Sequence, residues 1–109
     1  SVSFKNKPTK SNIINALRKF KTKITGLDLQ SAPEPFITYL ADDDRPQTGV
    51  DRSIHQGMGV TIGRLVEDTI FDWKFESLAH NTVRGAAGGA ILMAELLYKK
   101  GYIVKRSED

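Results

Sequence analysis

The run from Asn81 to Lys99 is the feature that most restricts the folds available to this chain. It predicts a long helix that is apolar on nearly every side, because alanine, leucine, isoleucine and methionine fill most of its positions. Its first turns contain Gly85, Gly88 and Gly89, each of which costs about 1 kcal/mol relative to alanine inside a helix. A chain tolerates that cost where another segment, domain or ligand must come close to the helix backbone. The helix is therefore expected to pack between two bodies, that is, with a structural unit on each side.

The start of this helix is also a candidate ligand site. Asn81 or Thr82 can cap backbone N–H groups that have no partner within the helix. Such donors, at the positive end of the helix dipole, suit a phosphate, a carboxamide or another backbone. A plain helix cap is the alternative explanation of the same two residues.

The rest of the sequence predicts an α+β fold. A strand end near Val2 is followed by a helix after Pro8, with Thr9 or Ser11 as its cap and Gly26 ending the helix or its trailing turn. Strands are expected over residues 36–40, buried on both faces, and over 57–63 and 71–76, which form an antiparallel hairpin. A further short extended segment is expected over 101–104. The order β-α-β-β-β-α indicates a largely antiparallel sheet with helices on one side.

Two patterns within these strands make specific predictions. Alternation with polar residues places Phe71, Trp73 and Phe75 on a core face. The glycines of the preceding strand, Gly57, Gly59 and Gly63, are costly there and often mark the close approach of another backbone or a ligand.

Size and composition set further bounds. The 109 residues form at most one domain, and they contain no cysteine. This excludes disulfides, cysteine-ligated metals and thiolate catalysis within the chain, and it fits a reducing, cytoplasmic location. No apolar stretch reaches the roughly 18 residues of a membrane span, so no membrane partner is expected. The chain lacks an initiator methionine and a secretion signal, and it is expected to begin inside a longer protein.

Charged and metal-ligating residues give weaker signals. The net charge of +3 comes from lysines and arginines clustered at both ends. These clusters form either a nucleic-acid patch or, as we expect, a solvated helix face and a basic tail, because no aromatic platform or zinc signature accompanies them. The run Asp42–Asp44 lacks the ligand spacing of a metal site, and no metal is expected. His55 is assigned to a polar surface loop and His80 to a structural role.

Three ordered blocks of residues resemble aspartate-semialdehyde dehydrogenase, in the branch found in archaea and fungi. Ala94–Leu97 extends the likeness, which covers essentially the whole chain from Val2. The blocks are Arg45-Pro46-Gln47 with Asp51-Arg52, then Gly57–Arg64, and above all His80–Gly88.

The resemblance implies the C-terminal part of a two-domain oxidoreductase. Residues 1–80 would belong to the catalytic and dimerisation domain, which is of the glyceraldehyde-3-phosphate dehydrogenase type. Residues 81–100 would form the terminal helix, which packs on an N-terminal Rossmann domain outside this chain, and 101–109 a tail. In the family, NADPH reduces β-aspartyl phosphate to aspartate semialdehyde, on the route to lysine, threonine and methionine.

The family's functional residues carry over to this chain only in part. Its nucleophilic cysteine, catalytic histidine, substrate-carboxylate arginine and dinucleotide fingerprint have no counterpart here, so no catalytic residue is assigned and the chain alone is expected to be inactive. Asn81 and Thr82 would approach the nicotinamide end of NADP in the intact enzyme, although the fragment alone is not expected to retain the cofactor. Arg84 is interpreted as an exposed or interdomain salt bridge.

The resemblance also implies a homo-oligomer, a dimer or tetramer, that associates through the catalytic-domain sheet. Arg45, Arg52 and Arg64 would serve that interface or lie in solvated loops. Two other interpretations remain open. One is the related malonyl-coenzyme A reductase, which shares the scaffold. The other is a stand-alone basic module that binds nucleic acid or an acidic partner.

Overall fold

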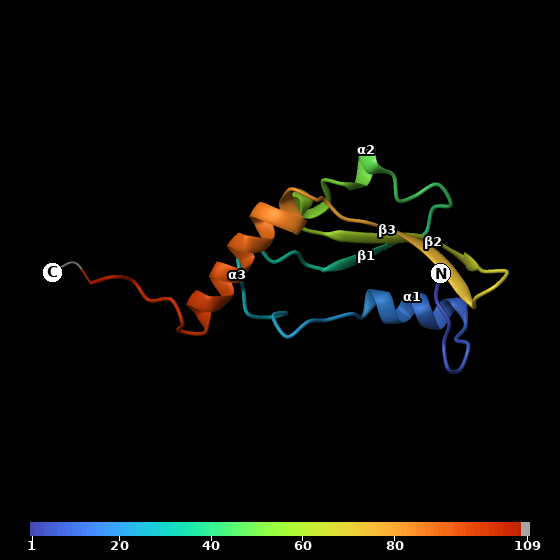
Figure 1. The fold of residues 1–109 in the computed structure, drawn as a ribbon, viewed down its shortest axis with the longest axis horizontal. Helices are drawn as coiled ribbons and strands as arrows, with labels where there is room; N and C mark the ends of the chain where they lie inside the picture. The colour runs from blue at the N-terminus through green and yellow to red at the C-terminus, as the bar shows by residue number, and fades with distance from the viewer. Residues whose placement is uncertain (108–109) are drawn as a thin grey trace.

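The computed structural model describes residues 1–107, which form a three-stranded mixed sheet with helices beside it and at one end (Figure 1). This confirms the α+β class and the helix at the end of the chain. Two short elements, η1 and η2, are a 3₁₀ turn and a π turn. The elements are α1 (Lys10–Arg18), β1 (Ile37–Leu40), α2 (Thr48–Asp51), η1 (Ile54–Gly57), β2 (Val60–Glu67), β3 (Trp73–Leu78), η2 (Val83–Ala87) and α3 (Gly88–Lys99).

The strands lie in the order β1-β2-β3. β2 and β3 form the predicted antiparallel hairpin, whereas β1 pairs with β2 in parallel. The parallel pairing is possible because residues 41–59 return the chain across the sheet through α2 and η1. The hairpin contains an irregularity between Gly63 and Val66, where Arg64 has a φ of 52°. Val2 adds an isolated antiparallel bridge to Trp73.

The first helix is shorter than the sequence predicts. Thr9 is its cap, as expected, and its side chain accepts a hydrogen bond from the Asn12 N–H. The helix ends at Arg18, well before Gly26, which has a φ of 86° in a later turn. Phe20 lies beyond the end of this helix and is 47% exposed.

The sheet is less covered than the alternation of apolar residues predicts. β1 is half-buried rather than buried on both faces. Of the expected core face, Trp73 is buried, but Phe71 and Phe75 are 51% and 38% exposed. The reason is that α1, the helix beside the sheet, packs on β1 (Figure 1). Residues 101–104 form no strand.

The molecule is elongated, with dimensions of 66 × 32 × 20 Å and a radius of gyration of 17.2 Å. A compact domain of this length has a radius of gyration of about 13 Å. Its accessible surface is 8007 Å², whereas a compact monomer of its mass exposes about 6,000 Å². The chain therefore leaves exposed a large surface that a compact domain buries.

A small cluster of buried apolar residues holds the last helix to the rest of the chain. It lies where the chain before β1, the turn between η1 and β2, and α3 meet, and several half-buried residues pack around it. Its members are Leu29, Phe36, Met58 and Leu92. Beyond this contact α3 extends away from the sheet (Figure 1). Among the described residues, none of the helices has the length and apolar character needed to cross a bilayer.

Candidate functional site at the start of the last helix

The predicted ligand-binding residues Asn81 and Thr82 lie in the turn between β3 and the last helix, and both are exposed. The helix opens with the π turn η2, in which Gly85 N–H donates to the His80 carbonyl and Ala87 N–H to that of Thr82, both at 3.1 Å. Such turns are rare and frequent at functional sites.

The predicted capping role of these residues is wrong for Thr82. It precedes the π turn but makes no capping hydrogen bond with its side chain. Its hydroxyl lies instead 3.2 Å from Nδ1 of His80. The local geometry thus leaves the helix start open instead of closing it with a side chain.

An open hollow of about 330 Å³ lies at this helix start. Its wall combines a guanidinium, an imidazole, an amide and two hydroxyls with two apolar side chains. It is lined by Thr48, Arg52, Leu78, Ala79, His80, Asn81 and Thr82. The hollow therefore joins α2, the end of β3 and the predicted ligand-binding turn.

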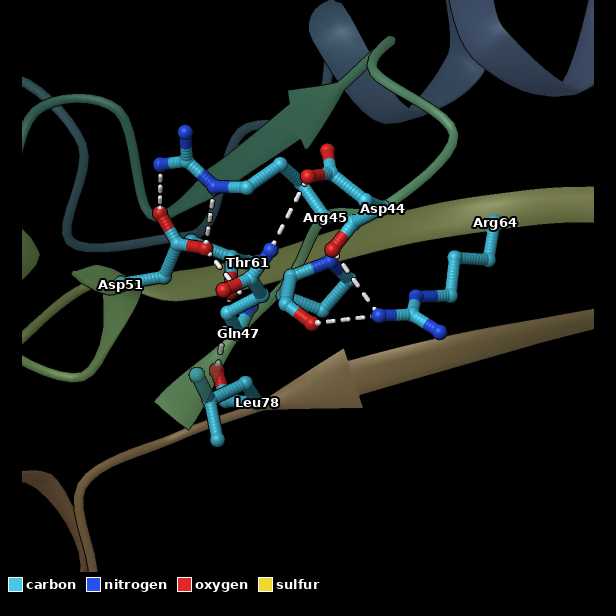
Figure 2. A network of polar contacts seen from close by, with 8 residues as sticks. Asp44, Arg45, Gln47, Asp51, Thr61, Arg64 and Leu78 are labelled. Carbon is cyan, nitrogen blue, oxygen red and sulfur yellow. Dashed lines mark hydrogen bonds and ion pairs between the residues drawn. The ribbon is translucent and has the colours of Figure 1, made fainter. Parts of the chain in front are cut away.

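An ion pair between Arg45 and the buried Asp51 ties α2 to the loop that precedes it. Asp51 is 4% exposed, and its carboxylate accepts hydrogen bonds from both Nε and Nη2 of Arg45, the first at 2.7 Å (Figure 2). The Gln47 N–H donates a third, at 2.8 Å. Hydrogen bonding from Arg45, followed by that from Gln47, lowers the pKa of Asp51 to about 2 in spite of its burial. A forked, charge-assisted pair of this kind holds its partners in one geometry.

The same loop packs directly on β2. A side chain at Gly63 would overlap the Arg45 carbonyl and lie 2.9 Å from Cδ of Pro46, so the close approach expected of this glycine is confirmed. Arg64 donates from Nη2 to the Asp44 carbonyl at 2.9 Å (Figure 2). It also pairs with Glu76 at 3.5 Å. The first two sequence blocks are therefore in contact.

The second and third blocks are also in contact. A side chain at Gly88 would overlap Sδ of Met58 and lie 2.9 Å from the Val83 carbonyl, while one at Gly57 would lie 3.0 Å from Cβ of Val83. Gly89 has a different reason to be glycine, because a Cβ there would lie 2.6 Å from the Arg84 carbonyl within the π turn. The glycines of the last helix thus allow close packing inside this chain.

The other candidate residues lie apart from the hollow. His55 is exposed, in a left-handed turn with a φ of 50°, as its surface assignment predicts. The guanidinium of Arg84 lies 5.5 Å from the centre of the Phe36 ring. Within residues 1–107, no group of histidine and carboxylate side chains could hold a metal ion.

The sequence did not identify Thr48 and Arg52 as parts of the site. Arg52 was expected at the oligomer interface or in a solvated loop, whereas Thr48–Asp51 forms a helical turn that Arg52 ends. The signal that could have found it is the spacing of Arg45 and Asp51. An arginine and an aspartate six residues apart, with a proline between them, can pair and close a loop. The side chain that follows the aspartate, here Arg52, then points away from the pair.

Comparison with known proteins confirms the resemblance. No protein-family model matches the chain. The chain is 41% identical over 105 residues to the aspartate-semialdehyde dehydrogenase of Candida albicans, covering 94% of this chain and 29% of that protein. It is 46% identical over 105 residues to the Schizosaccharomyces pombe enzyme of the same name, covering 93% and 29%.

Two further matches bear on the fold and on the alternative function. The chain is 44% identical over 107 residues to the malonyl CoA reductase (NADP) of Metallosphaera sedula, covering 96% of this chain and 30% of that protein. The crystal structure of the Candida albicans aspartate-semialdehyde dehydrogenase with NADP superposes with a TM-score of 0.79 at 38% identity, covering 94% of this chain and 29% of that one. The chain therefore spans about 30% of the length of the relatives that it matches.

Proposed function

We propose that this chain is the C-terminal part of an NADP-dependent aspartate-semialdehyde dehydrogenase. The intact enzyme would reduce β-aspartyl phosphate with NADPH to aspartate semialdehyde, in the cytoplasm. The observation that carries the proposal is similarity at 39–46% identity along nearly the whole chain to several enzymes of this name. The packing of the three sequence blocks against one another supports it, because it gives each block a place in one local structure.

The start of the last helix fits the nicotinamide end of the cofactor. Asn81 offers an amide that can pair with a carboxamide, and the apolar side chains of Leu78 and Ala79 line the same hollow. The Thr82 hydroxyl makes no capping hydrogen bond to the backbone N–H groups at the helix start. When bound, NADPH supplies the hydride. The role that we assign to Asn81 and Thr82 is to bind and orient the nicotinamide.

We assign the residues of the chemical step to the part of the protein outside this chain. Reduction of an acyl phosphate through a thioester needs a thiolate, and these 109 residues contain no cysteine. Residues 1–80 would supply part of the catalytic-domain sheet and its oligomer interface, with residues 101–109 as a tail. The exposed Phe71 and Phe75 of the hairpin support such an interface. α3 would pack on the Rossmann domain.

The direct test is an assay of the longer protein that carries this chain. Aspartate semialdehyde, phosphate and NADP should yield NADPH, and an Asn81→Ala variant should raise the KM for NADP by about tenfold, as expected for the loss of one good hydrogen bond. Lack of turnover with NADP and aspartate semialdehyde would refute the proposal. The isolated 109-residue chain should show no turnover.

Malonyl-coenzyme A reduction is the second candidate, because the Metallosphaera sedula relative of that name is as similar as the dehydrogenases. The two functions separate in one experiment. NADPH oxidation is measured with malonyl-coenzyme A, and NADP reduction with aspartate semialdehyde and phosphate. Turnover with malonyl-coenzyme A alone would replace the first proposal by this one.

A stand-alone basic module predicts different behaviour. Such a chain should be a stable monomer whose affinity for an oligonucleotide falls steeply with salt. A part of a larger enzyme with an exposed apolar helix should instead associate with other copies in sedimentation experiments.

A further inference from the structure

The hollow beside Asn81 contains a cation whose role the proposed function does not explain. Arg52 is exposed at the C-terminal end of α2 and lines this hollow with Thr48. Within residues 1–107, no carboxylate forms a salt bridge with it, whereas Arg45 and Arg64 each have one. An arginine beside hydroxyl groups in a hollow is a suitable binding site for an oxyanion.

The position of Arg52 is fixed by its neighbour in the chain. α2 has four residues, too few to be stable as a helix on its own. What holds it is Asp51, buried and bonded to Arg45 and to the Gln47 N–H. Adjacent residues of a helix point in directions about 100° apart. With Asp51 directed at Arg45, the following residue is directed elsewhere, and it lines the hollow.

The end of β3 forms the opposite wall and is tied to the same region. Thr61 of β2 pairs in register with Leu78, and its hydroxyl lies 3.5 Å from the Leu78 carbonyl (Figure 2). The turn that carries Asn81 and Thr82 begins directly after this residue. Both walls of the hollow are thus attached to β2, one through the packing of the Arg45 loop on Gly63 and one through the strand pairing.

We propose that Arg52 is a phosphate-binding residue of this hollow, with the Thr48 hydroxyl beside it. The proposal rests on the proposed function, which brings phosphate to the site from two sources. One is the diphosphate of NADP, and the other is the acyl phosphate substrate, or inorganic phosphate in the reverse direction. A guanidinium recognises either through paired N–H donors, which a lysine cannot reproduce.

The test compares Arg52→Gln, Arg52→Lys and a control, Arg18→Gln, in the longer protein. Arg18 is also an exposed arginine, on α1, where it lies 5.7 Å from the Tyr39 ring. The dissociation constant for NADPH is measured by fluorescence titration without turnover, and the KM for inorganic phosphate by NADP reduction. Thermal unfolding of each variant checks that the fold is retained, as expected for an exposed side chain.

Arg52→Gln should weaken one of the two ligands by about 10- to 100-fold, as expected for a lost charged hydrogen bond. Arg52→Lys should recover part of that loss, and Arg18→Gln should change neither constant. A higher NADPH dissociation constant assigns the residue to the dinucleotide, and a higher KM for phosphate alone assigns it to the reacting phosphate.

Two results would overturn the assignment. One is an Arg52→Gln protein that retains wild-type constants for both ligands, and the other is a wild-type protein that binds neither. Failure of the proposed function looks different. In that case wild type binds NADPH but does not turn over aspartate semialdehyde, and the reacting phosphate is no longer a ligand. A higher NADPH dissociation constant in Arg52→Gln then still supports the assignment, and an unchanged one overturns it.

Discussion

Two regions of this molecule differ in how their apolar and glycine residues are used. In the motif region, which comprises residues 45–64 and 80–88, backbone segments approach so closely that a single Cβ would overlap a neighbour at Gly63 or Gly88. In the outer region, which comprises the exposed side of α3 and of the β2–β3 hairpin, large apolar side chains are open to solvent. They include Val66, Phe71, Phe75, Ile91, Met93 and Tyr98.

The difference shows which residues of the last helix have packing partners within this chain. Gly88 of the last helix finds its partners within the chain, in Met58 and Val83. The apolar side chains of this helix mostly do not, since Leu92 is the one residue of α3 that is buried. Helix composition alone indicated two bodies around this helix, and the structure places one of them inside the chain. The second is the part of the longer protein that we propose.

The largest effect should come from removing the anchor of the last helix. Leu92 is 7% exposed and packs with Leu29, Phe36 and Met58. Leu92→Ala should lower the free energy of unfolding by about 2–5 kcal/mol, because it leaves a cavity in a small core. Urea denaturation of the chain measures it. A loss below about 0.5 kcal/mol would mean that α3 is not held by this cluster.

A smaller but distinct effect is expected from Gly63→Ala. The new methyl group would overlap the Arg45 carbonyl, which belongs to backbone and cannot rotate away. Overpacking of this kind costs about 1–3 kcal/mol. Gly49→Ala is the matched control, because nothing lies within 4 Å of a Cβ built there. Equal stability of the two variants in urea would show that the Arg45 loop does not press on β2.

Local signals explain what could be predicted from the sequence. The Thr9 cap and the antiparallel hairpin depend on residues close together in the chain, and both are confirmed. The exposure of Phe71 could not be foreseen, because alternation shows which face is apolar but not whether this chain covers it. The end of α1 at Arg18 was not predicted either, because no proline or glycine follows it before Gly26.

The candidate site was predictable to a similar extent. The turn at Asn81 and Thr82 was identified from its residues, and in the structure it lines a hollow. Its role in cofactor binding remains a proposal. The π turn that follows could not be read from the sequence, since α and π turns share the same residue preferences. Arg52 was missed because its position depends on the pairing of Arg45 with Asp51 across a loop.

Asp51→Asn tests the pairing of Arg45 with Asp51, and its expected loss of stability is intermediate. Because the Arg45 side chain remains 28% exposed, water compensates part of the loss, and the melting temperature should fall by roughly 5 °C. The pKa of Asp51 is lowered to about 2 from an ordinary 3.8, so its contribution is present above pH 4. It should be lost as the pH falls from about 4 to about 2.

The difference in melting temperature between wild type and Asp51→Asn should therefore be constant above pH 4 and shrink below it. Asp68, whose pKa is also lowered to about 2 by the Ser1 hydroxyl and the Ile70 N–H, is present in both proteins and does not affect the difference. Thermal unfolding at a series of pH values provides the measurement. A difference that does not change down to pH 2 would contradict the lowered pKa.

The smallest effect in this chain should come from Ile91→Ala, the neighbour of Leu92 on the same helix. Ile91 is 54% exposed, and alanine is the better helix former, so the free energy of unfolding should change by less than about 0.5 kcal/mol. In the longer protein, the same substitution should cost about 1–3 kcal/mol if another domain covers this side of α3. The pair Ile91→Ala and Leu92→Ala, measured by urea denaturation in both proteins, therefore separates the two sides of one helix. A cost at Ile91 equal to that at Leu92 in the short chain would contradict the division, since it would mean that this chain buries both sides itself.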